Sequence, residues 1–310
     1  MALRIGFIGA NSPNKTLCDA LRTLSGASEP VEIVAVADSD LSKSKIWAAS
    51  CGASAFSSAP KMFGALEKGA LDAVFVALEA AKRGAAENAS IAHGAALYLV
   101  PPLGAHIRTS NALGLAVRKN GVLVGVHAPH RYASALDVAR KIAASKTRKI
   151  AAFDARFTLA ETENLWLGAW PLFDVLRVLG GEPKRIFGLG GAGETAPAGA
   201  ALCELRSGAL ASVCVERGVK SAGEIRFSRG DAQFRLQFDS RRVTFEQREG
   251  ETQTVWRSED LVEAQLRAFV NALVHGRRAE LRPQLSEAAK TQKWALAAQR
   301  AASGGKWVEI

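Results

Sequence analysis

The chain has 310 residues, of which 48% are hydrophobic and 23% are charged. This balance is typical of a globular protein and excludes an intrinsically disordered chain. No stretch approaches the roughly 18 apolar residues that a membrane-spanning helix requires, so we expect no membrane partner. The formal net charge is +10, but the basic residues form neither a tail nor a long run of one sign. We therefore expect no nucleic-acid partner.

The beginning of the chain and its cysteines bear on location. Met1 to Gly9 become polar too early for a secretory signal peptide and are typical of a first β-strand. The four cysteines form no C-x-x-C pattern and have no neighbouring histidine, which argues against a zinc site or a redox pair. We expect reduced thiols, no bound metal and a cytoplasmic location.

The first third of the chain alternates apolar runs with helical patterns, which is typical of a parallel α/β sheet. Strands are predicted over residues 3–9, 31–38, 73–77, 97–100 and 122–126, and helices over 13–24 and 85–93. We expect a Rossmann-type dinucleotide-binding domain over residues 1–130, with its ligands at the carboxyl ends of the strands.

The pattern changes near Ala133. A helix is predicted over 133–144, and period-two alternation then predicts antiparallel strands over 150–157, 200–205, 211–216, 224–227, 234–238 and 242–247. Helices follow over 259–274 and 286–302. We expect an α+β substrate and oligomerisation domain over residues 131–310, with a mostly antiparallel sheet. One open face of that sheet predicts a homodimer or homotetramer.

The loop after the first predicted strand lies where a dinucleotide fold binds phosphate. The usual G-x-G-x-x-G pattern would place glycines at Gly9, Asn11 and Asn14, so only the first is present. Asparagine tolerates the left-handed backbone of such a turn, but the Asn11 side chain would crowd a pyrophosphate. Asp38 ends the second strand at the spacing at which an acid binds the adenosine ribose. A solvated turn aspartate is the alternative interpretation of Asp38.

We expect Gly9, Ala10, Asn11 and Asp38 to contact the cofactor. NAD is the expected cofactor, because an acid at position 38 selects against the 2′-phosphate of NADP. Lysines nearby weaken that preference and leave NADP as an alternative. The two missing glycines leave weakened or lost binding as further alternatives.

Five features together resemble a known family in their order and spacing: the first strand with its Gly9 loop, Asp38, Gly94 to Leu103, Val124 to Tyr132, and the carboxyl-terminal stretch from Phe269. The family is that of the glucose–fructose oxidoreductase and inositol dehydrogenase enzymes (Gfo/Idh/MocA), and the resemblance covers nearly the whole chain. It implies nicotinamide-dependent hydride transfer to or from a small molecule.

The resemblance also implies an atypical active site. Pro101 stands where the family has its catalytic lysine, in the segment expected to lie against the cofactor. Pro129 stands in place of an asparagine and Pro171 in place of a histidine. Proline can neither exchange a proton nor donate a hydrogen bond.

Other residues are candidates for the missing proton transfer. His127 and His130 flank Pro129, and an imidazole can act as an acid or a base, with a structural role at a domain boundary as the alternative for both. Asp174 matches an aspartate of the family's second-domain motif. Lys82 and Arg83 predict a solvated helix start, with binding of an anionic substrate as the alternative.

We therefore expect an NAD(P)-dependent oxidoreductase of Gfo/Idh/MocA type whose catalytic residues are His127, His130 and Asp174. Reduction of a conjugated or imine-like substrate needs less proton relay than oxidation of a polyol, so a non-sugar reductase is favoured. The alternative is a catalytically inactive protein of the same fold that serves as a binding or interaction module.

Overall fold

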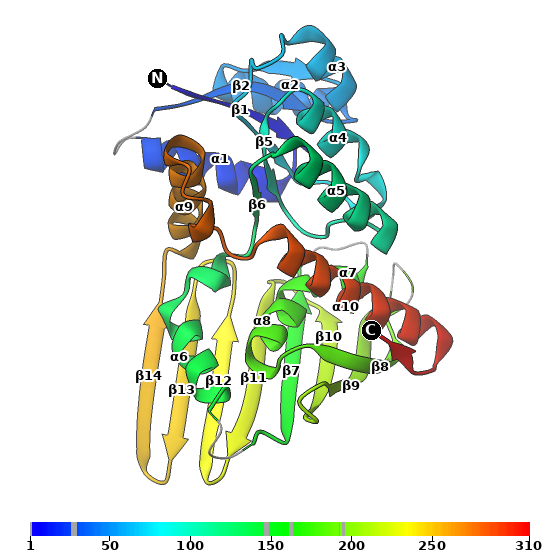
Figure 1. Ribbon diagram of the computed structural model, residues 1–310, viewed down its shortest axis with the longest axis vertical. Coiled ribbons are helices and arrows are strands. Elements are labelled where there is room, and N and C mark those ends of the chain that lie inside the picture. Colours follow the sequence, from blue (N-terminus) through cyan, green and yellow to red (C-terminus); the bar gives the residue numbers. More distant parts are fainter. Residues whose placement is uncertain (1, 26–29, 146–148, 161–163, 192, 194–195) are drawn as a thin grey trace. The chain divides into compact units, whose positions relative to one another are not determined.

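The computed structural model describes residues 2–25, 30–145, 149–160, 164–191, 193 and 196–310 (Figure 1). They form two compact units. Unit 1 consists of Met1–His127 and Val262–Ala289, and unit 2 consists of Ala128–Leu261 and Lys290–Ile310. The chain therefore passes through most of unit 2, returns to unit 1 for residues 262–289, and ends in unit 2.

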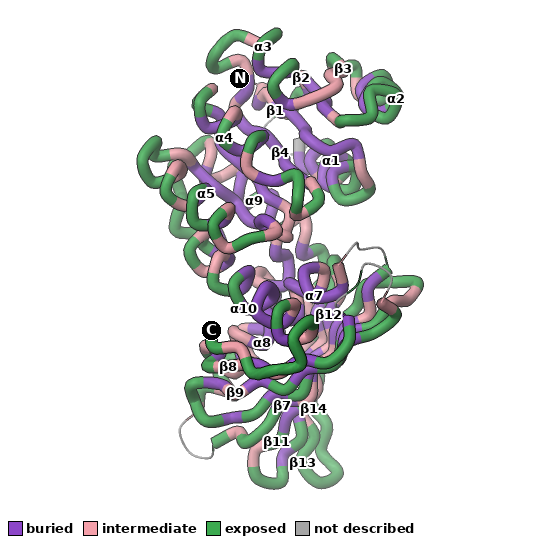
Figure 2. Tube along the Cα trace, turned by 90° about the vertical axis from the view of Figure 1, so that its right-hand side faces the viewer, coloured by how far each residue is buried: buried purple, intermediate pink, exposed green. Residues whose placement is uncertain are grey.

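Unit 1 contains a six-stranded parallel sheet with strand order β3-β2-β1-β4-β5-β6. Its strands β1 and β4 are almost completely buried (Figure 2), as expected for a parallel sheet covered on both faces. This strand order is that of the Rossmann fold and confirms the predicted fold class. The strands are β1 (Leu3–Ile8), β2 (Val31–Ala37), β3 (Ser54–Phe56), β4 (Ala73–Val76), β5 (Ala96–Leu99) and β6 (Val124–Val126).

Helices cover both faces of this sheet. On one face α1 (Ser12–Ser25), α2 (Leu41–Cys51) and α9 (Leu261–His275) contribute to a single hydrophobic cluster with Phe7 and Phe75. On the other face lie α3 (Ala59–Ala65), α4 (Ala85–Ala92) and α5 (Ile107–Asn120).

Helix α9 lies outside the predicted extent of the first domain. The residues that follow position 130 were expected to belong to the second domain, but Val262–Ala289 pack with unit 1. Leu266, Phe269 and Ala272 of α9 are buried in the cluster beneath the parallel sheet. The hydrophobic surface of β4 and β5 is thus covered by a helix that comes from far along the chain.

Unit 2 contains a nine-stranded sheet with strand order β14-β13-β12-β11-β7-β10-β9-β8-β15. Neighbouring strands are antiparallel except for the pair β7 and β10, which is parallel, and this confirms the predicted mostly antiparallel sheet. The strands are β7 (Ala152–Leu159), β8 (Pro183–Gly190), β9 (Ala198–Leu205), β10 (Leu210–Arg217), β11 (Ala222–Arg229), β12 (Ala232–Phe238), β13 (Val243–Glu249), β14 (Thr252–Ser258) and β15 (Val308–Glu309).

One face of this sheet is covered by α6 (Ser134–Ala143), α7 (Leu165–Gly168), α8 (Trp170–Gly180) and α10 (Leu285–Gly304). Burial alternates along the strands, so that Phe234, Leu236 and Phe238 of β12 face the helices. Within the part of the chain that the structure describes, no helix covers the opposite face.

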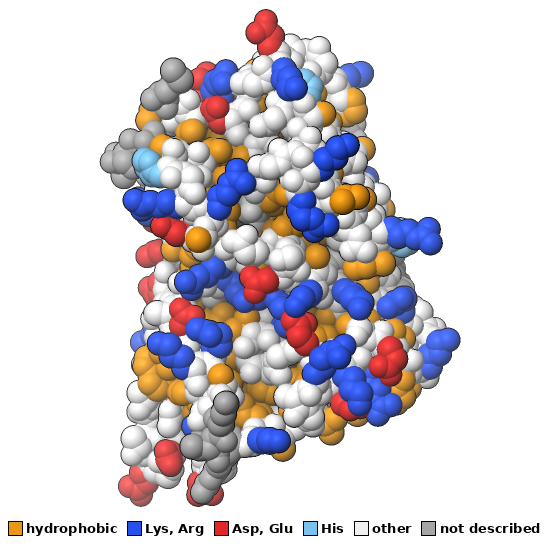
Figure 3. Space-filling view, viewed as in Figure 1, with side chains coloured by type: hydrophobic (Ala, Val, Ile, Leu, Met, Phe, Trp, Pro, Cys, Tyr) orange, Lys and Arg blue, Asp and Glu red, His pale blue; other side chains and the backbone are white. Residues whose placement is uncertain are grey.

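Charged side chains of both signs are mixed on the surface in Figure 3. Many of them form ion pairs; Glu204, for example, binds Lys184 and Arg185 at 2.6 Å each. Among the described residues, none of the helices has the length and apolarity needed to span a bilayer.

Candidate functional site

The turn after β1 requires glycine at position 9. Gly9 has a φ of +98°, and a Cβ at this position would lie 2.1 Å from the carbonyl oxygen of Ala77. The side chain of Asn11 binds the same carbonyl oxygen, because its Nδ2 donates a hydrogen bond to it at 2.6 Å. Gly9 therefore makes a tight turn at the place where a Rossmann fold has its phosphate-binding loop.

Two asparagines take the places of the missing glycines. Asn14 is fully buried, and its Nδ2 donates hydrogen bonds to the carbonyl oxygens of Ile8 and Gly9 at 3.0 and 2.8 Å. Its backbone N–H donates to Oδ1 of Asn11 at 3.3 Å. Since Pro13 has no N–H, the first turn of α1 offers a phosphate fewer donors than a glycine-rich loop would.

Asp38 ties the end of β2 to this loop. Its Oδ2 accepts a hydrogen bond from the N–H of Ala10 at 2.6 Å, and its Oδ1 accepts one from the N–H of Asp40 at 2.8 Å. The structure thus brings together the predicted cofactor-binding residues Ala10 and Asp38.

These residues fit the adenosine half of a dinucleotide better than its pyrophosphate. The Asp38 carboxylate is half-buried and uses only part of its accepting capacity on the backbone, so ribose hydroxyl groups can still donate to it. The donors for pyrophosphate are reduced by Pro13 and by the Asn11–Asn14 hydrogen bond. Contact of Gly9, Ala10, Asn11 and Asp38 with a cofactor stays a prediction.

Pro101 follows β5 and is joined to Pro102 by a cis peptide bond. The carbonyl just before it, that of Val100, accepts a hydrogen bond from Nη2 of Arg83. Arg83 also binds the carboxylate of Glu87 at 3.0 Å and the carbonyl oxygen of Leu78 at 3.2 Å. This cluster fixes the loops that follow β4 and β5.

The expectation of a solvated helix start at Lys82 and Arg83 is wrong for Arg83. Its side chain is only 1% exposed, because the guanidinium is directed at Glu87 and two carbonyl groups. Lys82 is exposed and pairs with Glu79 at 2.6 Å. Arg83 therefore links the loops that follow β4 and β5, a role that the sequence did not predict.

His127 follows β6 and is half-buried. Its backbone N–H donates to the carbonyl oxygen of Leu99 on β5 at 2.8 Å. Its ring nitrogen Nδ1 lies 3.0 Å from the hydroxyl oxygen of Tyr98, a fully buried residue that the sequence had not singled out. Tyr98 lies in the strand predicted over 97–100, but nothing in the sequence indicated its partner.

In unit 2, His130 and Asp174 lie together at the centre of a buried cluster. Asp174 is fully buried and accepts hydrogen bonds from Nε and Nη2 of Arg131 at 2.6 and 2.8 Å. His130 Nε2 lies 2.8 Å from Oδ2 of Asp174. The hydroxyl of Thr291 donates a hydrogen bond to Oδ1 of Asp174 at 2.9 Å. The Asp174 carboxylate on α8 thus binds side chains from two other elements, the 3-10 helix Pro129–Tyr132 and α10.

The pKa of Asp174 reflects two opposed effects. Burial alone raises it, but the hydrogen bonds and positive charges of Arg131 and His130 outweigh burial and hold the pKa well below its ordinary value. The carboxylate is therefore ionised throughout the neutral range. This environment favours an orienting role for Asp174, on His130 and Arg131, over proton exchange by Asp174 itself.

Pro129 and Pro171 stand at the beginnings of the elements that form this cluster. Pro129 opens the 3-10 helix that carries His130, and Pro171 lies in the first turn of α8, which carries Asp174. Among the described His, Cys, Asp and Glu side chains, no group of three or more is arranged to hold a metal ion.

Replacing Asp38 with alanine tests whether this carboxylate binds the cofactor. The variant loses two backbone hydrogen bonds, so we expect the free energy of unfolding to fall by about 1–3 kcal/mol in urea. We also expect the dissociation constant for NADH, measured by calorimetry, to rise at least about tenfold.

Asp40→Ala is the matched control. Asp40 caps α2, because its Oδ1 accepts from the N–H groups of Ser42 and Lys43. Its loss should cost about 1 kcal/mol of stability and leave NADH binding unchanged. Equal losses of affinity in the two variants would mean that Asp38 acts only through the fold.

Asp174→Asn removes a buried charge without changing the size of the side chain. We expect unfolding at pH 7 to become easier by about 3–5 kcal/mol, because Arg131 loses its counter-ion. Since folding lowers the pKa of Asp174, the charge stabilises the protein above the unfolded pKa of about 3.9, and this stabilisation is lost as the pH falls below it.

Urea unfolding at a series of pH values measures this difference. The gap between the parent and the Asp174→Asn variant should be constant above about pH 5 and should shrink below about pH 4. Asp137→Asn, which alters an exposed pair with Arg140, should change stability by less than about 0.5 kcal/mol. A gap that widens in acid would contradict an ionised carboxylate.

The amino-terminal part of the chain matches a known protein family. The model of the Gfo/Idh/MocA oxidoreductases, an oxidoreductase family with an NAD-binding Rossmann fold, matches residues 3–128. No curated protein sequence matches the chain significantly.

Solved structures share the fold over nearly the whole chain. Levoglucosan dehydrogenase in complex with NADH and L-sorbose has a TM-score of 0.81 at 13% identity, covering 100% of this chain and 99% of that one. An oxidoreductase from Agrobacterium radiobacter in complex with NAD+, L-tartaric acid and magnesium has a TM-score of 0.79 at 16% identity, covering 99% and 98%. A 3-ketoreductase from Actinomadura kijaniata in complex with NADP has a TM-score of 0.79 at 15% identity, covering 98% of each chain.

Identities this low establish a shared fold and no more. The family model, however, matches the domain that contains Gly9, Asp38 and Pro101. The resemblance inferred from the sequence is thereby confirmed for the amino-terminal Rossmann domain, whose residues 3–128 match the model of the Gfo/Idh/MocA oxidoreductase family.

Proposed function

We propose that this protein is a nicotinamide-dependent oxidoreductase that acts on a small molecule. The observation that carries the proposal is the hydrogen bond from the Ala10 N–H to Asp38 at 2.6 Å. It joins the Gly9 turn to the predicted ribose-binding acid, at the carboxyl ends of β1 and β2, where a Rossmann domain binds its dinucleotide. The family model that matches this domain is that of an NAD-binding fold.

NAD is the cofactor that we propose, with NADP as the alternative. The negative charge of Asp38 disfavours a 2′-phosphate, whereas Lys43 nearby is exposed and favours one. The solved relatives hold NAD+, NADH or NADP, so they support a nicotinamide cofactor without selecting one. When bound, this cofactor supplies or accepts a hydride.

The protein's own residues would position the reactants and exchange the proton. Gly9, Ala10, Asn11, Asp38 and Pro101 would hold the cofactor. His127 and His130 are the candidate proton-exchanging groups, and Asp174 orients His130 through its 2.8 Å contact with Nε2.

The substrate class follows from the three prolines. With Pro101, Pro129 and Pro171 in place of polar residues, a reduction that takes its proton from water is favoured over oxidation of a polyol. We propose a non-sugar reductase in the cytoplasm. The free thiols of Cys18, Cys51, Cys203 and Cys214 agree with a reducing compartment.

The second candidate function is a catalytically inactive binding or interaction module. The hydrogen bonds of Asn11 with Ala77 and Asn14 favour it, because they use groups at the place where a pyrophosphate would bind. Calorimetric titration with NAD, NADH, NADP and NADPH separates the two candidates. Micromolar binding of at least one supports the oxidoreductase, and dissociation constants weaker than about 1 mM for all four support the module.

Asn11→Gly tests whether the Asn11 side chain weakens the binding of a cofactor, because the substitution should strengthen it. The variant frees the N–H of Asn14 and removes the side chain from the loop, so we expect its dissociation constant for NADH to fall at least about fivefold. Asn120→Gly is the control, since Nδ2 of Asn120 donates a hydrogen bond within its own helix, to the carbonyl oxygen of Ala116 at 2.9 Å. Unchanged affinity in Asn11→Gly would contradict the proposed crowding of the phosphate loop.

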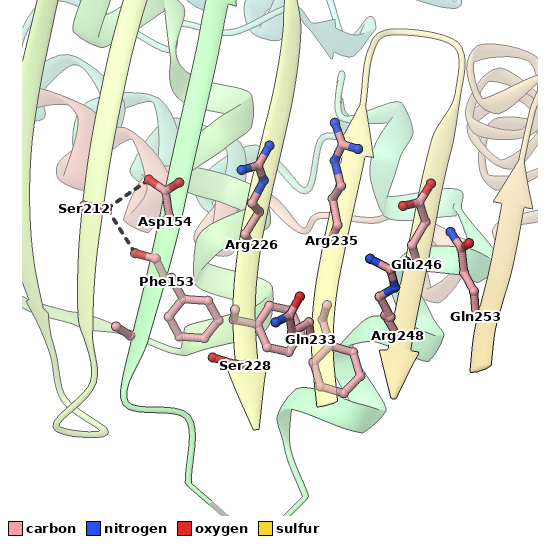
Figure 4. A pocket seen from close by; sticks show the side chains of 13 residues that line it. Phe153, Asp154, Ser212, Arg226, Ser228, Gln233, Arg235, Glu246, Arg248 and Gln253 are labelled. Atoms are coloured by element: carbon pink, nitrogen blue, oxygen red, sulfur yellow. Dashed lines mark hydrogen bonds between the residues drawn. The ribbon is translucent and has the colours of Figure 1, made fainter. Parts of the chain in front are cut away.

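We further propose that the open face of the sheet in unit 2 contacts a second copy of the chain. Arg226 and Arg235 lie side by side on this face, and Glu246 lies next to Arg235 on β13 (Figure 4). A shallow cavity of about 660 Å³ lies among them. Toward β8 and β9 the face becomes apolar, with Leu189 58% and Leu202 40% exposed. Apolar area together with charges of both signs suits self-association.

Leu202→Glu tests this contact. A buried carboxylate at the interface would oppose association, so we expect light scattering to give the mass of a dimer or tetramer for the parent and of a monomer for the variant. Leu115→Glu, at a residue 62% exposed on α5 of unit 1, is the control. A parent protein that is monomeric at micromolar concentration would refute the contact.

A further inference from the structure

We propose that Cys18 and Cys51 form a disulfide bond when the protein is exposed to a peroxide, and that this bond locks α1 to α2. The inference concerns an oxidation site within unit 1 and does not rest on the oxidoreductase function proposed above. Its basis is the direct contact of two thiols that are distant along the chain.

Two helices of unit 1 bring these thiols together. Cys18 lies in the middle of α1, and Cys51 is the last residue of α2. One turn after Cys18, Nη2 of Arg22 donates a hydrogen bond to the carbonyl oxygen of Ser50, the residue before Cys51, at 3.4 Å. At this junction the side chains of Cys18 and Cys51 are hydrogen-bonded to each other. The fold thus creates a thiol pair that the spacing of the cysteines did not indicate.

The two thiols differ in their access to solvent. Cys18 is only 1% exposed and belongs to the hydrophobic cluster beneath the parallel sheet. Cys51 packs against this cluster and is half-buried. Its Sγ donates a hydrogen bond to the carbonyl oxygen of Trp47 at 3.2 Å. A small oxidant in solution therefore meets Cys51 first.

The pKa of Cys18 gives the same order of reaction. Burial, and then the neighbouring Cys51, raise this pKa to about 12, while the charge of Arg22 opposes them. Cys18 therefore keeps its proton near neutral pH. Since the thiolate is the form that attacks a peroxide, Cys18 is protected from direct oxidation and stays available as the second thiol.

The oxidation has two steps. In the first, the Cys51 sulfur attacks hydrogen peroxide, the O–O bond breaks, water leaves, and Cys51 becomes a sulfenic acid. In the second, the Cys18 sulfur attacks the Cys51 sulfur, the S–O bond breaks, and the hydroxyl group leaves as water with the proton of Cys18. Two thiols are thereby oxidised and one peroxide is reduced to two waters. Contact between the side chains makes the second step intramolecular, which offsets the high pKa of Cys18.

The bond locks the helices in positions that they already hold. Because the thiols are in contact before oxidation, their sulfur atoms need to approach each other only slightly. Cys51 ends its helix, and Gly52 follows with a φ of +71°, so the Cys51 side chain can turn while the interior of α2 stays unchanged. A cross-link between residues distant along the chain restricts the unfolded state and so stabilises the folded one.

Peptide mapping tests whether the bond forms. The whole protein is treated with hydrogen peroxide at pH 7, its remaining thiols are blocked with iodoacetamide, and it is digested with trypsin without a reductant. We expect peptide 16–22, which contains Cys18, to be joined to peptide 46–61, which contains Cys51. Dithiothreitol should separate them. A sulfinic acid at Cys51 with Cys18 still free would overturn the inference, as would two unmodified thiols under conditions that oxidise Cys214.

The other two cysteines supply the control. Cys203 and Cys214 lie on opposite faces of the sheet in unit 2, because Cys203 is buried beneath the helices and Cys214 is exposed. Cys214→Ser should therefore give the same cross-linked peptide as the parent, and Cys51→Ser should give none. A peptide in which Cys18 is joined to Cys203 or Cys214 would contradict the assignment.

Thermal unfolding measures the lock. After oxidation we expect the melting temperatures of the parent and of Cys214→Ser to rise by about 5 °C, with no rise in Cys51→Ser, and dithiothreitol should reverse the change. An oxidised parent that melts no higher than the reduced parent would refute the lock. None of these measurements requires a cofactor, so a protein that binds no nicotinamide would refute the proposed function and leave this inference standing.

Discussion

The carbonyl oxygen of Ala77 lies so near the turn at Gly9 that the ends of β1 and β4 admit nothing larger than a hydrogen between them. This close approach sets the path of the loop that follows. Asn11 can reach the same carbonyl, Ala10 presents its N–H to Asp38, and Asn14 is drawn into the core beneath the turn. The loop is thus held by its own polar side chains, in a place where a glycine-rich loop would leave its backbone open to a phosphate.

Two buried charges organise the surroundings of the candidate residues. Removing an ion from water costs several kcal/mol unless partners replace the water, and Arg83 and Asp174 each gather such partners from separate segments. Arg83 joins the loops after β4 and β5, and Asp174 joins α8, α10 and the turn that carries His130. Each of these charges therefore fixes the positions of segments that are distant along the chain.

Local patterns predicted the Rossmann half well, because an apolar run ending in glycine or aspartate is an unambiguous signal. The strand expected over 3–9 is Leu3–Ile8, and that expected over 31–38 is Val31–Ala37. Strand β8 was missed because it begins with Pro183 and has two glycines in its last three residues, and β14 because most of its residues are exposed at an edge. The Tyr98–His127 contact and the bond from Thr291 to Asp174, 117 residues apart, depend on tertiary packing that no local pattern encodes.

The return of α9 to the first unit has a consequence for how such a protein can be divided. A fragment that stops near residue 130 contains every strand of the parallel sheet but lacks Leu266, Phe269 and Ala272. The aromatic rings of Phe75 and Tyr98 would then face water, and the severed piece would tend to aggregate. A Rossmann domain excised from this chain and fused to another protein must therefore include α9 as well as residues 1–127.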